Sequence, residues 1–206
     1  PAADITASAP KRISIDGRFD DWDDVGPEYR ASRGNAVERD SRGWGDIYYR
    51  DTSARNDIVA AKVARDDRYV YFYVACAAPI TPATDEAWMR LYIDIDRDHA
   101  TGWEGYDFIV NRISPDGDRA VVERSRGGWE WTPAGEAQLR VEGCHMELRI
   151  PRKTLGVEHG ADFEIEFKWA DNTQREGDIS DFWVSGDAAP AGRFNYLYRT
   201  AAVSKK

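Results

Sequence analysis

The stretch Cys144-His-Met-Glu-Leu-Arg-Ile150 alternates strictly, with apolar residues at even positions and polar residues at odd positions. A period of two is typical of a strand that has one face in the core and the other toward solvent. Phe163-Glu-Ile-Glu-Phe-Lys-Trp169 repeats the pattern. Tyr69–Cys76 is apolar or aromatic on both faces, which suits a central strand. These three segments predict an all-β fold.

Shorter strand-like runs fill most of the remaining chain, and turn residues such as Pro115-Asp-Gly117 and Gly127-Gly128 separate them. Helix signals are scarce, with short candidates at 20–25 and 151–155. We expect a single antiparallel β-sandwich, jelly-roll-like, over residues 11–200, with a flexible segment at 1–10 and a flexible tail at 201–206. Apolar strand-like runs also lie at 88–93 and 108–113. Weaker strands are expected at 12–15, 47–50, 58–64, 120–124, 128–131, 139–142 and 194–199.

Composition narrows the classes of function. The 206 residues are 42% hydrophobic and 12% aromatic, with eight Trp and ten Tyr, which suits a β-fold with ring-lined surfaces. The formal net charge is −9, whereas a nucleic-acid-binding surface is basic, so no nucleic-acid partner is expected. No apolar run has the length of a bilayer span.

The chain begins Pro-Ala-Ala-Asp, without Met and without a signal peptide. This start is typical of a processed secreted or periplasmic protein, or of a piece of a larger one. Cys76 and Cys144 both fall in strand-like runs, and the sequence leaves open whether they are free thiols or a disulfide.

Carboxylates crowd the stretch Asp94-Ile-Asp-Arg-Asp-His-Ala-Thr-Gly-Trp-Glu-Gly-Tyr-Asp107, which joins two strand-like runs. Such groups repel one another unless a cation neutralises them, and Ca²⁺ takes six to eight oxygen ligands on a flexible loop. The glycines and the strand flanks do not match an EF-hand. A solvated acidic turn is the alternative. The expected calcium ligands are Asp94, Asp96, Asp98, Thr101 and Asp107.

Two other acidic groups carry weaker signals. Asp171, Asn172, Asp178 and Asp181 offer oxygen atoms for a second Ca²⁺ or, more simply, for turn hydrogen bonds. Near the start, the aspartates of Ile15-Asp-Gly-Arg-Phe-Asp-Asp-Trp22 favour a turn and a helix cap that seats Trp22 in the core.

Several tryptophans lie where a sugar could reach them. A pyranose ring packs its C–H groups on an aromatic face and its hydroxyls on planar polar side chains. Trp22, Trp88 and Trp169 are expected in the core, and any loop tryptophan could instead be a packing lid. The expected stacking residues are Trp44, Trp103, Trp129 and Trp131, with Arg42, Asn172 and Arg193 as polar partners.

An ordered set of motifs resembles family 9 carbohydrate-binding modules and their DOMON-like relatives. It comprises the 15–22 segment, Asp66-Asp-Arg-Tyr-Val-Tyr-Phe72, the strand and acidic loop of 88–108, Met146-Glu-Leu-Arg-Ile-Pro151, and the segments 168–172 and 186–196. The resemblance covers nearly the whole chain. It implies a β-sandwich, bound calcium, secretion and attachment to a polysaccharide-degrading enzyme. The family's paired sugar-stacking tryptophans have no clear match here.

We therefore expect a non-catalytic, calcium-stabilised carbohydrate-binding module that binds a polysaccharide or oligosaccharide and belongs to a secreted glycan-active protein. The alternative is a docking domain that braces a linked catalytic domain. No hydrolase or zinc motif occurs, although a glycosidase carboxylate pair remains open. A haem site with Met89, Met146 or His145 as ligands is disfavoured, because Met146 and His145 point to opposite faces.

Overall fold

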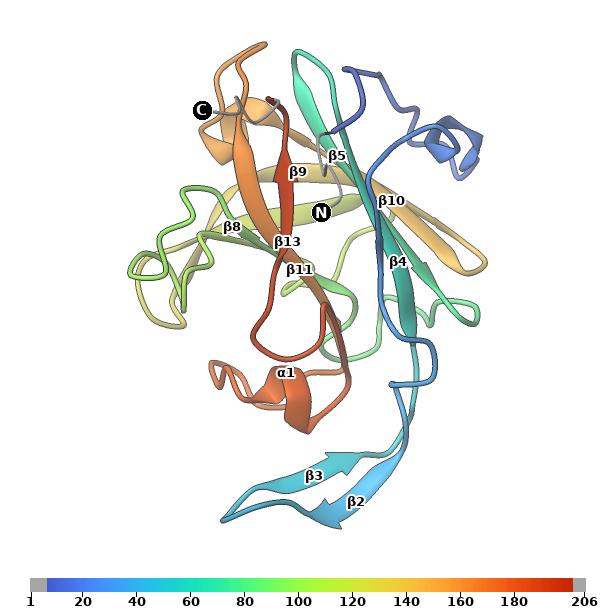
Figure 1. Ribbon diagram of the computed structural model, residues 1–206, viewed down its shortest axis with the longest axis vertical. Helices are drawn as coiled ribbons and strands as arrows, with labels where there is room; N and C mark the ends of the chain where they lie inside the picture. The colour runs from blue at the N-terminus through green and yellow to red at the C-terminus, as the bar shows by residue number, and fades with distance from the viewer. Residues whose placement is uncertain (1–6, 202–206) are drawn as a thin grey trace, which may run out of the picture.

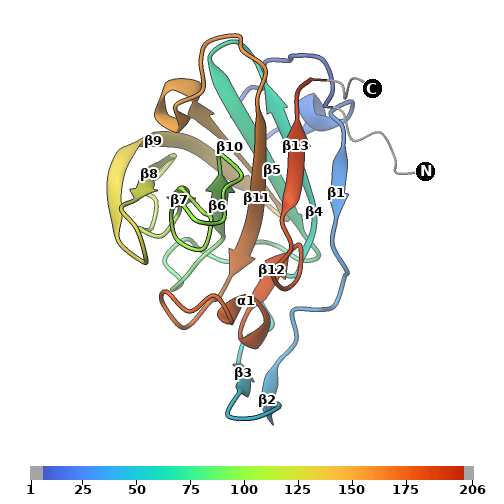
Figure 2. The same cartoon turned by 60° about the vertical axis from the view of Figure 1, so that its left-hand side comes forward.

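The computed structural model describes residues 7–201 and is nearly all β. A single eleven-stranded antiparallel sheet curls until it is almost a barrel, so that its two halves face each other across the core (Figures 1 and 2). The all-β, sandwich-like fold is therefore confirmed. In spatial order the strands are β1 (Glu28–Arg30), β4 (Ile58–Arg65), β5 (Tyr69–Cys76), β10 (His145–Pro151), β9 (Trp131–Glu142), β8 (Arg119–Ser125), β7 (Phe108–Val110), β6 (Arg90–Asp94), β11 (Glu164–Asp171) and β12 (Asp187–Ala189), with β13 (Tyr196–Arg199) also paired to β11.

The core lies inside the curled sheet. The even-numbered apolar residues of β10 are fully buried there, as the alternation predicts, together with the apolar faces of the other long strands. Trp88 and Trp169 belong to the core, whereas Trp22 lies in a separate cluster outside the sheet; all three are buried, as expected.

The two ends of the sheet meet through side chains rather than through a backbone ladder. The Tyr29 hydroxyl on β1 donates to the Leu197 carbonyl on β13 at 2.6 Å, and the Tyr196 hydroxyl donates to the Arg30 carbonyl at 3.2 Å. The Tyr29 and Tyr196 rings also contact each other, with centroids 4.9 Å apart. A tyrosine seam thus closes the barrel.

The N-terminal segment covers the outer face of β4 and β5. Trp22, at the end of a single 3-10 turn η1 (Asp20–Trp22), packs there with Ile13 and Ile15 against Tyr71 and Tyr73. Glu147 on β10 is fully buried beneath this segment and accepts hydrogen bonds from the backbone of Asp16 and Gly17 and from the Trp22 indole. The 15–22 and 146–151 motifs of the sequence are therefore in contact through Glu147.

The acidic loop and the segment around α1 (Asp181–Val184) cover the outer face of β6, β7 and β11. Trp103 and Tyr106 from the loop pack with Tyr92, Phe182 and other apolar residues of this layer. The loop is therefore fastened to the sheet through its aromatic side chains.

A separate hairpin, β2 (Arg39–Arg42) and β3 (Tyr48–Asp51), extends beyond the end of the sheet next to α1 (Figures 1 and 2). We call residues 39–51 the arm. Its base is tied to the body through Asp51, which accepts a hydrogen bond from Asn172 at 3.0 Å and faces Arg39 at 3.7 Å. Arg39 also donates to the Gly186 carbonyl.

Several predicted elements differ from the structure. Residues 12–15 form no strand, and 128–131 is a turn from which β9 starts only at Trp131. The helical candidate at 151–155 is a 3-10 turn, η2 (Arg152–Leu155). Ala7 is hydrogen-bonded to the Arg199 carbonyl, while 1–6 and 202–206, predicted to be flexible, lie outside the described residues.

Cys76 and Cys144 are free thiols. They are neighbours in the backbone, since the Cys76 amide donates to the Cys144 carbonyl at 2.9 Å. None of the helices in residues 7–201 has the length and apolar character that a membrane span requires.

Candidate metal centre and ligand cleft

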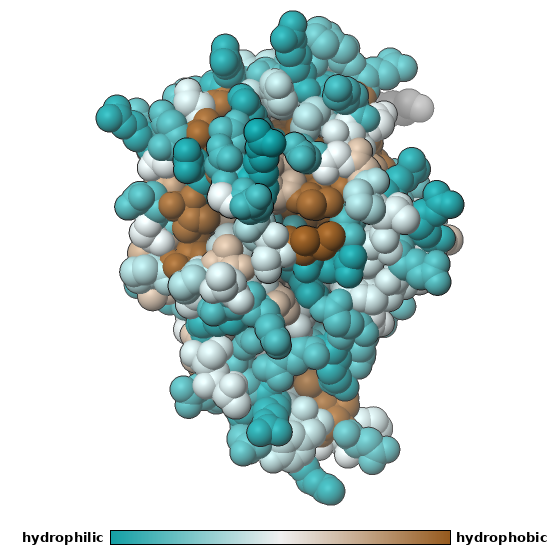
Figure 3. All heavy atoms as spheres, turned by 180° about the vertical axis from the view of Figure 1, so that it is seen from behind, coloured by the Kyte–Doolittle hydropathy of each residue, from teal (hydrophilic) through white to brown (hydrophobic). Residues whose placement is uncertain are grey.

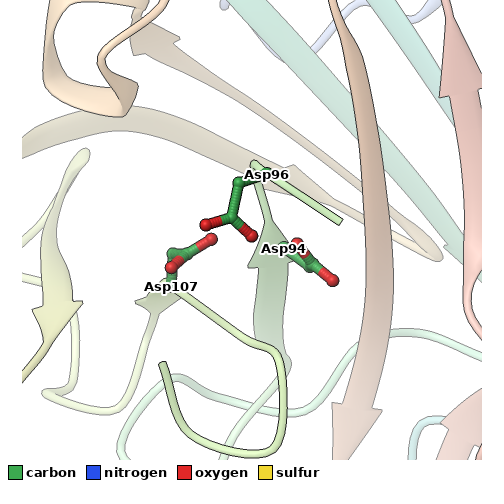
Figure 4. Close-up of side chains that lie close together, drawn as sticks. All are labelled: Asp94, Asp96 and Asp107. Carbon is green, nitrogen blue, oxygen red and sulfur yellow. The ribbon is translucent and has the colours of Figure 1, made fainter. Parts of the chain in front are cut away.

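Three aspartates converge where β6 ends and β7 begins. Ile93 pairs with Phe108 in the antiparallel ladder, so Asp94 and Asp107 follow and precede this pair on adjacent strands. Asp96 lies two residues beyond Asp94. Each of the three offers a carboxylate oxygen within 4.8 Å of the others, and Figure 4 shows Asp96 lying between the other two.

Hydrogen bonds hold these carboxylates in place. The Ile95 amide donates to Asp107 Oδ2 at 2.9 Å, and the Thr101 hydroxyl lies 3.1 Å from both oxygens of Asp96. The Asp98 amide also donates to Asp96 Oδ1, at 2.9 Å. The chain between the strands is thus folded around the Asp96 side chain.

The electrostatics of the group favour a cation. Asp94 is fully buried, and its Oδ2 atom has no hydrogen-bond partner within residues 7–201. Burial, together with the charges of Asp107 and Asp96, raises the pKa of Asp94 to about 6. Burial also raises the pKa of Asp107 above its ordinary value. A bound cation would reverse both shifts, because it stabilises the ionised carboxylates.

The donor set fits a hard divalent ion. Carboxylate and hydroxyl oxygens are the ligands that Ca²⁺ prefers. A buried oxygen is rarely left without a partner, so the unpartnered Oδ2 atom of Asp94 is a second indication, besides the acidic charge, that a cation binds here. Asp98 Oδ1 accepts a hydrogen bond from the Ala100 amide, and its carboxylate is not among the three that lie within 4.8 Å of one another. Thr101 contacts the triad through Asp96. The structure thus brings together three of the five predicted ligands and places Thr101 behind one of them.

The second oxygen-rich group is dispersed. Asp171 pairs with Arg55 at 2.8 Å and accepts the Met89 amide, while Asp181 accepts hydrogen bonds from Ser185 and from the Arg175 amide. Within residues 7–201, Asp94, Asp96 and Asp107 are the one trio of His, Cys, Asp or Glu that has metal-binding spacing.

A cleft of about 850 Å³ lies between the base of the arm and the end of the sheet. Arginines supply much of its wall: Arg55 pairs with Asp85 at 3.2 Å, and Arg112 donates to both oxygens of the buried Glu123. Arg90 is 4% exposed, pairs with Glu176, and its Nε atom has no partner in the described residues. The lining residues that carry planar polar groups are Arg50, Arg55, Asp85, Glu86, Arg90, Arg112, Asn172, Gln174 and Glu176.

Three of the four predicted stacking tryptophans form one cluster, and Trp129 in its centre contacts the cleft residues Arg90 and Glu176, although none of the three lines the cleft. The Trp129 ring lies 4.4 Å from Trp103 and 5.5 Å from Trp131, both edge-on. Trp103, however, is only 5% exposed, so the expectation that it offers a face to a ligand is wrong; it is a packing residue. Trp129 and Trp131 are half-buried, and Trp44 stands apart at the arm's turn, 90% exposed.

The predicted polar partners have different surroundings. Asn172 lines the cleft and holds the base of the arm. Arg42 is exposed on β2. Arg193 lines a separate pocket of about 280 Å³ with His99, Tyr106 and Asn195, and so does not meet the tryptophans.

Sequence reasoning missed Arg90 and Glu176. A signal for Arg90 existed, since a charged residue sits inside the apolar run 88–93 and such a residue is rarely buried without a specific partner. Glu176 had no comparable signal, because it lies in an acidic, turn-rich segment. Met89 and Met146 are buried in the core, whereas His145 packs against Tyr73 outside it, so these residues do not share a haem-sized space.

No family model, curated protein or solved structure matches the chain, so the resemblance to family 9 carbohydrate-binding modules rests on the motifs alone.

Proposed function

We propose that this chain is a non-catalytic carbohydrate-binding module of a secreted glycan-active protein, stabilised by calcium. The observation that carries the proposal is the cleft: its wall is rich in guanidinium, amide and carboxylate groups. Trp129 lies outside this lining but contacts two of its residues, Arg90 and Glu176, and so marks the margin of the cleft. Sugar hydroxyls pair well with planar polar groups, while the C–H face of a sugar ring packs on an indole. Binding of this kind involves no covalent step.

Trp129 is held at the margin by two cleft residues. Its Nε1 donates to Glu176 Oε2 at 2.8 Å, and the Arg90 guanidinium lies 5.9 Å from its ring centroid. The ring is therefore fixed before a ligand arrives, which lowers the entropic cost of stacking. Glu176 also pairs with Arg90, so one carboxylate positions both groups.

Calcium would act at a distance from the sugar. Asp94, Asp96 and Asp107 would hold the ion, which neutralises their charges and fixes the acidic loop. The same loop carries Trp103, whose ring supports Trp129 at 4.4 Å. An ordered loop would thus keep Trp129 at the cleft margin.

A structural domain that braces a neighbouring catalytic domain is the second candidate. The burial of Trp103 favours it, because a ring expected to stack on a ligand serves packing instead. Much of the surface is hydrophilic on the side opposite to Figure 1, with separate small apolar patches (Figure 3). The face drawn in Figure 3 thus has no broad apolar area of the kind that stable docking interfaces present.

Calorimetry against a panel of soluble polysaccharides tests the proposal. We expect at least one glycan to bind, and Glu176→Ala to weaken that binding about tenfold or more, since a hydrogen bond to a charged group contributes about 1.5–3 kcal/mol. Glu130→Ala is the matched control, because Glu130 is exposed and lies outside the cleft lining. If no polysaccharide of the panel binds, the sugar-binding proposal is wrong and a structural domain is the better interpretation.

A further inference from the structure

We propose, building on the proposed sugar-binding function, that the ligand is an extended polysaccharide chain that runs out of the cleft and along the arm, where Tyr48 stacks on one of its sugar rings. A glycan end or a single residue would need only the cleft. The arm adds a second, outer binding position, so the domain would recognise internal stretches of a chain.

The first observation is that the cleft adjoins a second pocket. This pocket, of about 300 Å³, is lined by residues of the arm and of the segment that contains α1. It shares Arg50 and Gln174 with the cleft. The two pockets are therefore neighbours with these side chains between them, and we call the pair the groove.

The second observation is the period of β3. Tyr48 and Arg50 are two residues apart on β3, so their side chains lie on the same face, and Thr52 follows directly after the strand. Tyr48 lines the outer pocket, Thr52 lines the cleft, and Arg50 lines both. Successive residues of β3 and of the segment after it thus lead from the outer pocket to the cleft, which is the direction in which a chain would lie.

The third observation is that Tyr48 is suited to stacking. Its side chain is 48% exposed although it is aromatic, and its hydroxyl donates to Asp40 Oδ1 on the paired strand at 2.7 Å. This bond holds the ring on β3. Trp44 is more exposed, but it lies in the turn and does not line either pocket, so we assign the outer position to Tyr48.

The opposite wall supplies polar groups that suit a neutral or weakly charged chain. Arg175 lines the outer pocket and is paired with Asp178 at 3.1 Å and with Asp181 at 3.5 Å. Arg50 and Gln174 at the junction can donate to sugar hydroxyls. The groove thus offers one aromatic ring, that of Tyr48, among hydrogen-bonding side chains, which suits the hydroxyl groups and ring faces of a glycan.

The length of the ligand provides the test. Calorimetry would measure the affinity of a purified series from the disaccharide to the hexasaccharide, prepared from the polysaccharide that binds best. We expect the affinity of the unaltered protein to rise about fivefold to tenfold along the series. Tyr48→Ala should abolish that rise and leave disaccharide binding unchanged, whereas Tyr48→Phe should keep it. Trp44→Ala is the control and should bind the whole series normally.

Each outcome has a separate meaning. If affinity does not change with length, or if Tyr48→Ala weakens every oligosaccharide equally, the extended site is wrong although the cleft still binds sugar. If no oligosaccharide binds, the proposed function fails and this inference with it. Should Tyr48→Ala unfold the arm, Arg50→Ala, at the junction of the two pockets, would take its place and should reduce the affinity for the longer oligosaccharides the most.

Discussion

The indole nitrogen of Trp22 donates to Glu147 Oε2 at 2.9 Å, across 125 residues of sequence. The other oxygen of Glu147 accepts the amides of Asp16 and Gly17, both at 2.9 Å. One buried carboxylate thus fastens the whole N-terminal segment to β10. This anchor explains why the 15–22 segment contains a turn and a tryptophan, and the explanation needs no ligand.

Removing this anchor should destabilise the fold. Glu147→Ala would leave three donors without a partner, at a cost of about 1–3 kcal/mol for each buried one. We expect the free energy of unfolding, measured by urea denaturation, to fall by about 3 kcal/mol. The control is Glu142→Ala, at an exposed glutamate near the hairpin turn, which should change it by less than about 0.5 kcal/mol.

Calcium should stabilise the protein, because an ion that binds only the folded state raises stability by mass action. The gain is about 2.7 kcal/mol at a concentration one hundred times the Kd. Asp96→Ala should lose most of the difference in melting temperature between calcium and chelator, whereas Asp98→Ala, outside the triad, should keep it. Identical melting curves for the unaltered protein under both conditions would contradict the metal site.

The pH dependence of the metal-free protein follows from Asp94. Its pKa is about 6 in the folded state against 3.8 for an ordinary Asp, so the folded protein binds the proton more tightly than the unfolded chain does. The free energy of unfolding should therefore fall as the pH rises from about 4 to about 6. With calcium the trend should reverse, because the ion requires the ionised carboxylate. Asp94→Asn should flatten the metal-free curve, which chemical denaturation at each pH would measure.

Lys168 should make the free energy of unfolding depend on pH in the alkaline range. It is fully buried on β11, donates to the Pro190 and Gly192 carbonyls, and lies 5.1 Å from the Phe182 ring centroid. Burial lowers its pKa to about 7, below the ordinary 10.5. The unfolded chain then binds more protons between these values, so stability should rise with pH above about 7. Lys168→Met should remove this rise, and an unchanged slope would show that Lys168 titrates normally.

The base of the arm offers a local test. Asn172 has a φ of 57°, which Gly also adopts, so Asn172→Gly removes the bonds to Asp51 and Ser53 without backbone strain. We expect faster tryptic cleavage at Arg42 and Arg50, with a small change in melting temperature. Asn111→Gly is the contrasting variant: its φ is 64°, but its amide donates to the Met89 carbonyl in the core, so global stability should fall instead.

The long strands could be predicted because one face of each strand lies in the core, and that face carries apolar residues at alternate positions. In β10 the apolar residues Met146, Leu148 and Ile150 alternate and are buried, and Ile165, Phe167 and Trp169 do the same in β11. Glu147 and Lys168, at polar positions of the two strands, are buried as well. One strand of the arm, β3, was predicted at 47–50 and is confirmed. Its partner β2 and the edge strand β12 could not be predicted, since Arg39-Asp-Ser-Arg42 and Asp187-Ala-Ala189 carry no such alternation. These short strands depend on tertiary hydrogen bonds, such as those of Asp51 and Asp187.

The parts of the candidate site that lie close together in the sequence could be predicted, and the parts that come from distant segments could not. Asp94 and Asp107 flank a strand pairing, so their convergence follows from the sequence. Trp103 was misassigned because its loop folds back over the outer face of the sheet, which no local pattern reveals. The cleft unites β3, β6 and the 172–176 segment, which are far apart in the chain, and only the closed sheet brings them together.

The tyrosine seam between β1 and β13 has a consequence for association between molecules. An open sheet of this length would leave two unpaired edges, each a template for another chain's strand. Here each edge is short and faces the other, and the Tyr29 and Tyr196 hydroxyls occupy carbonyls that an incoming strand would need. The seam thereby disfavours edge-to-edge aggregation, although no continuous backbone ladder joins the two edges as in a closed barrel.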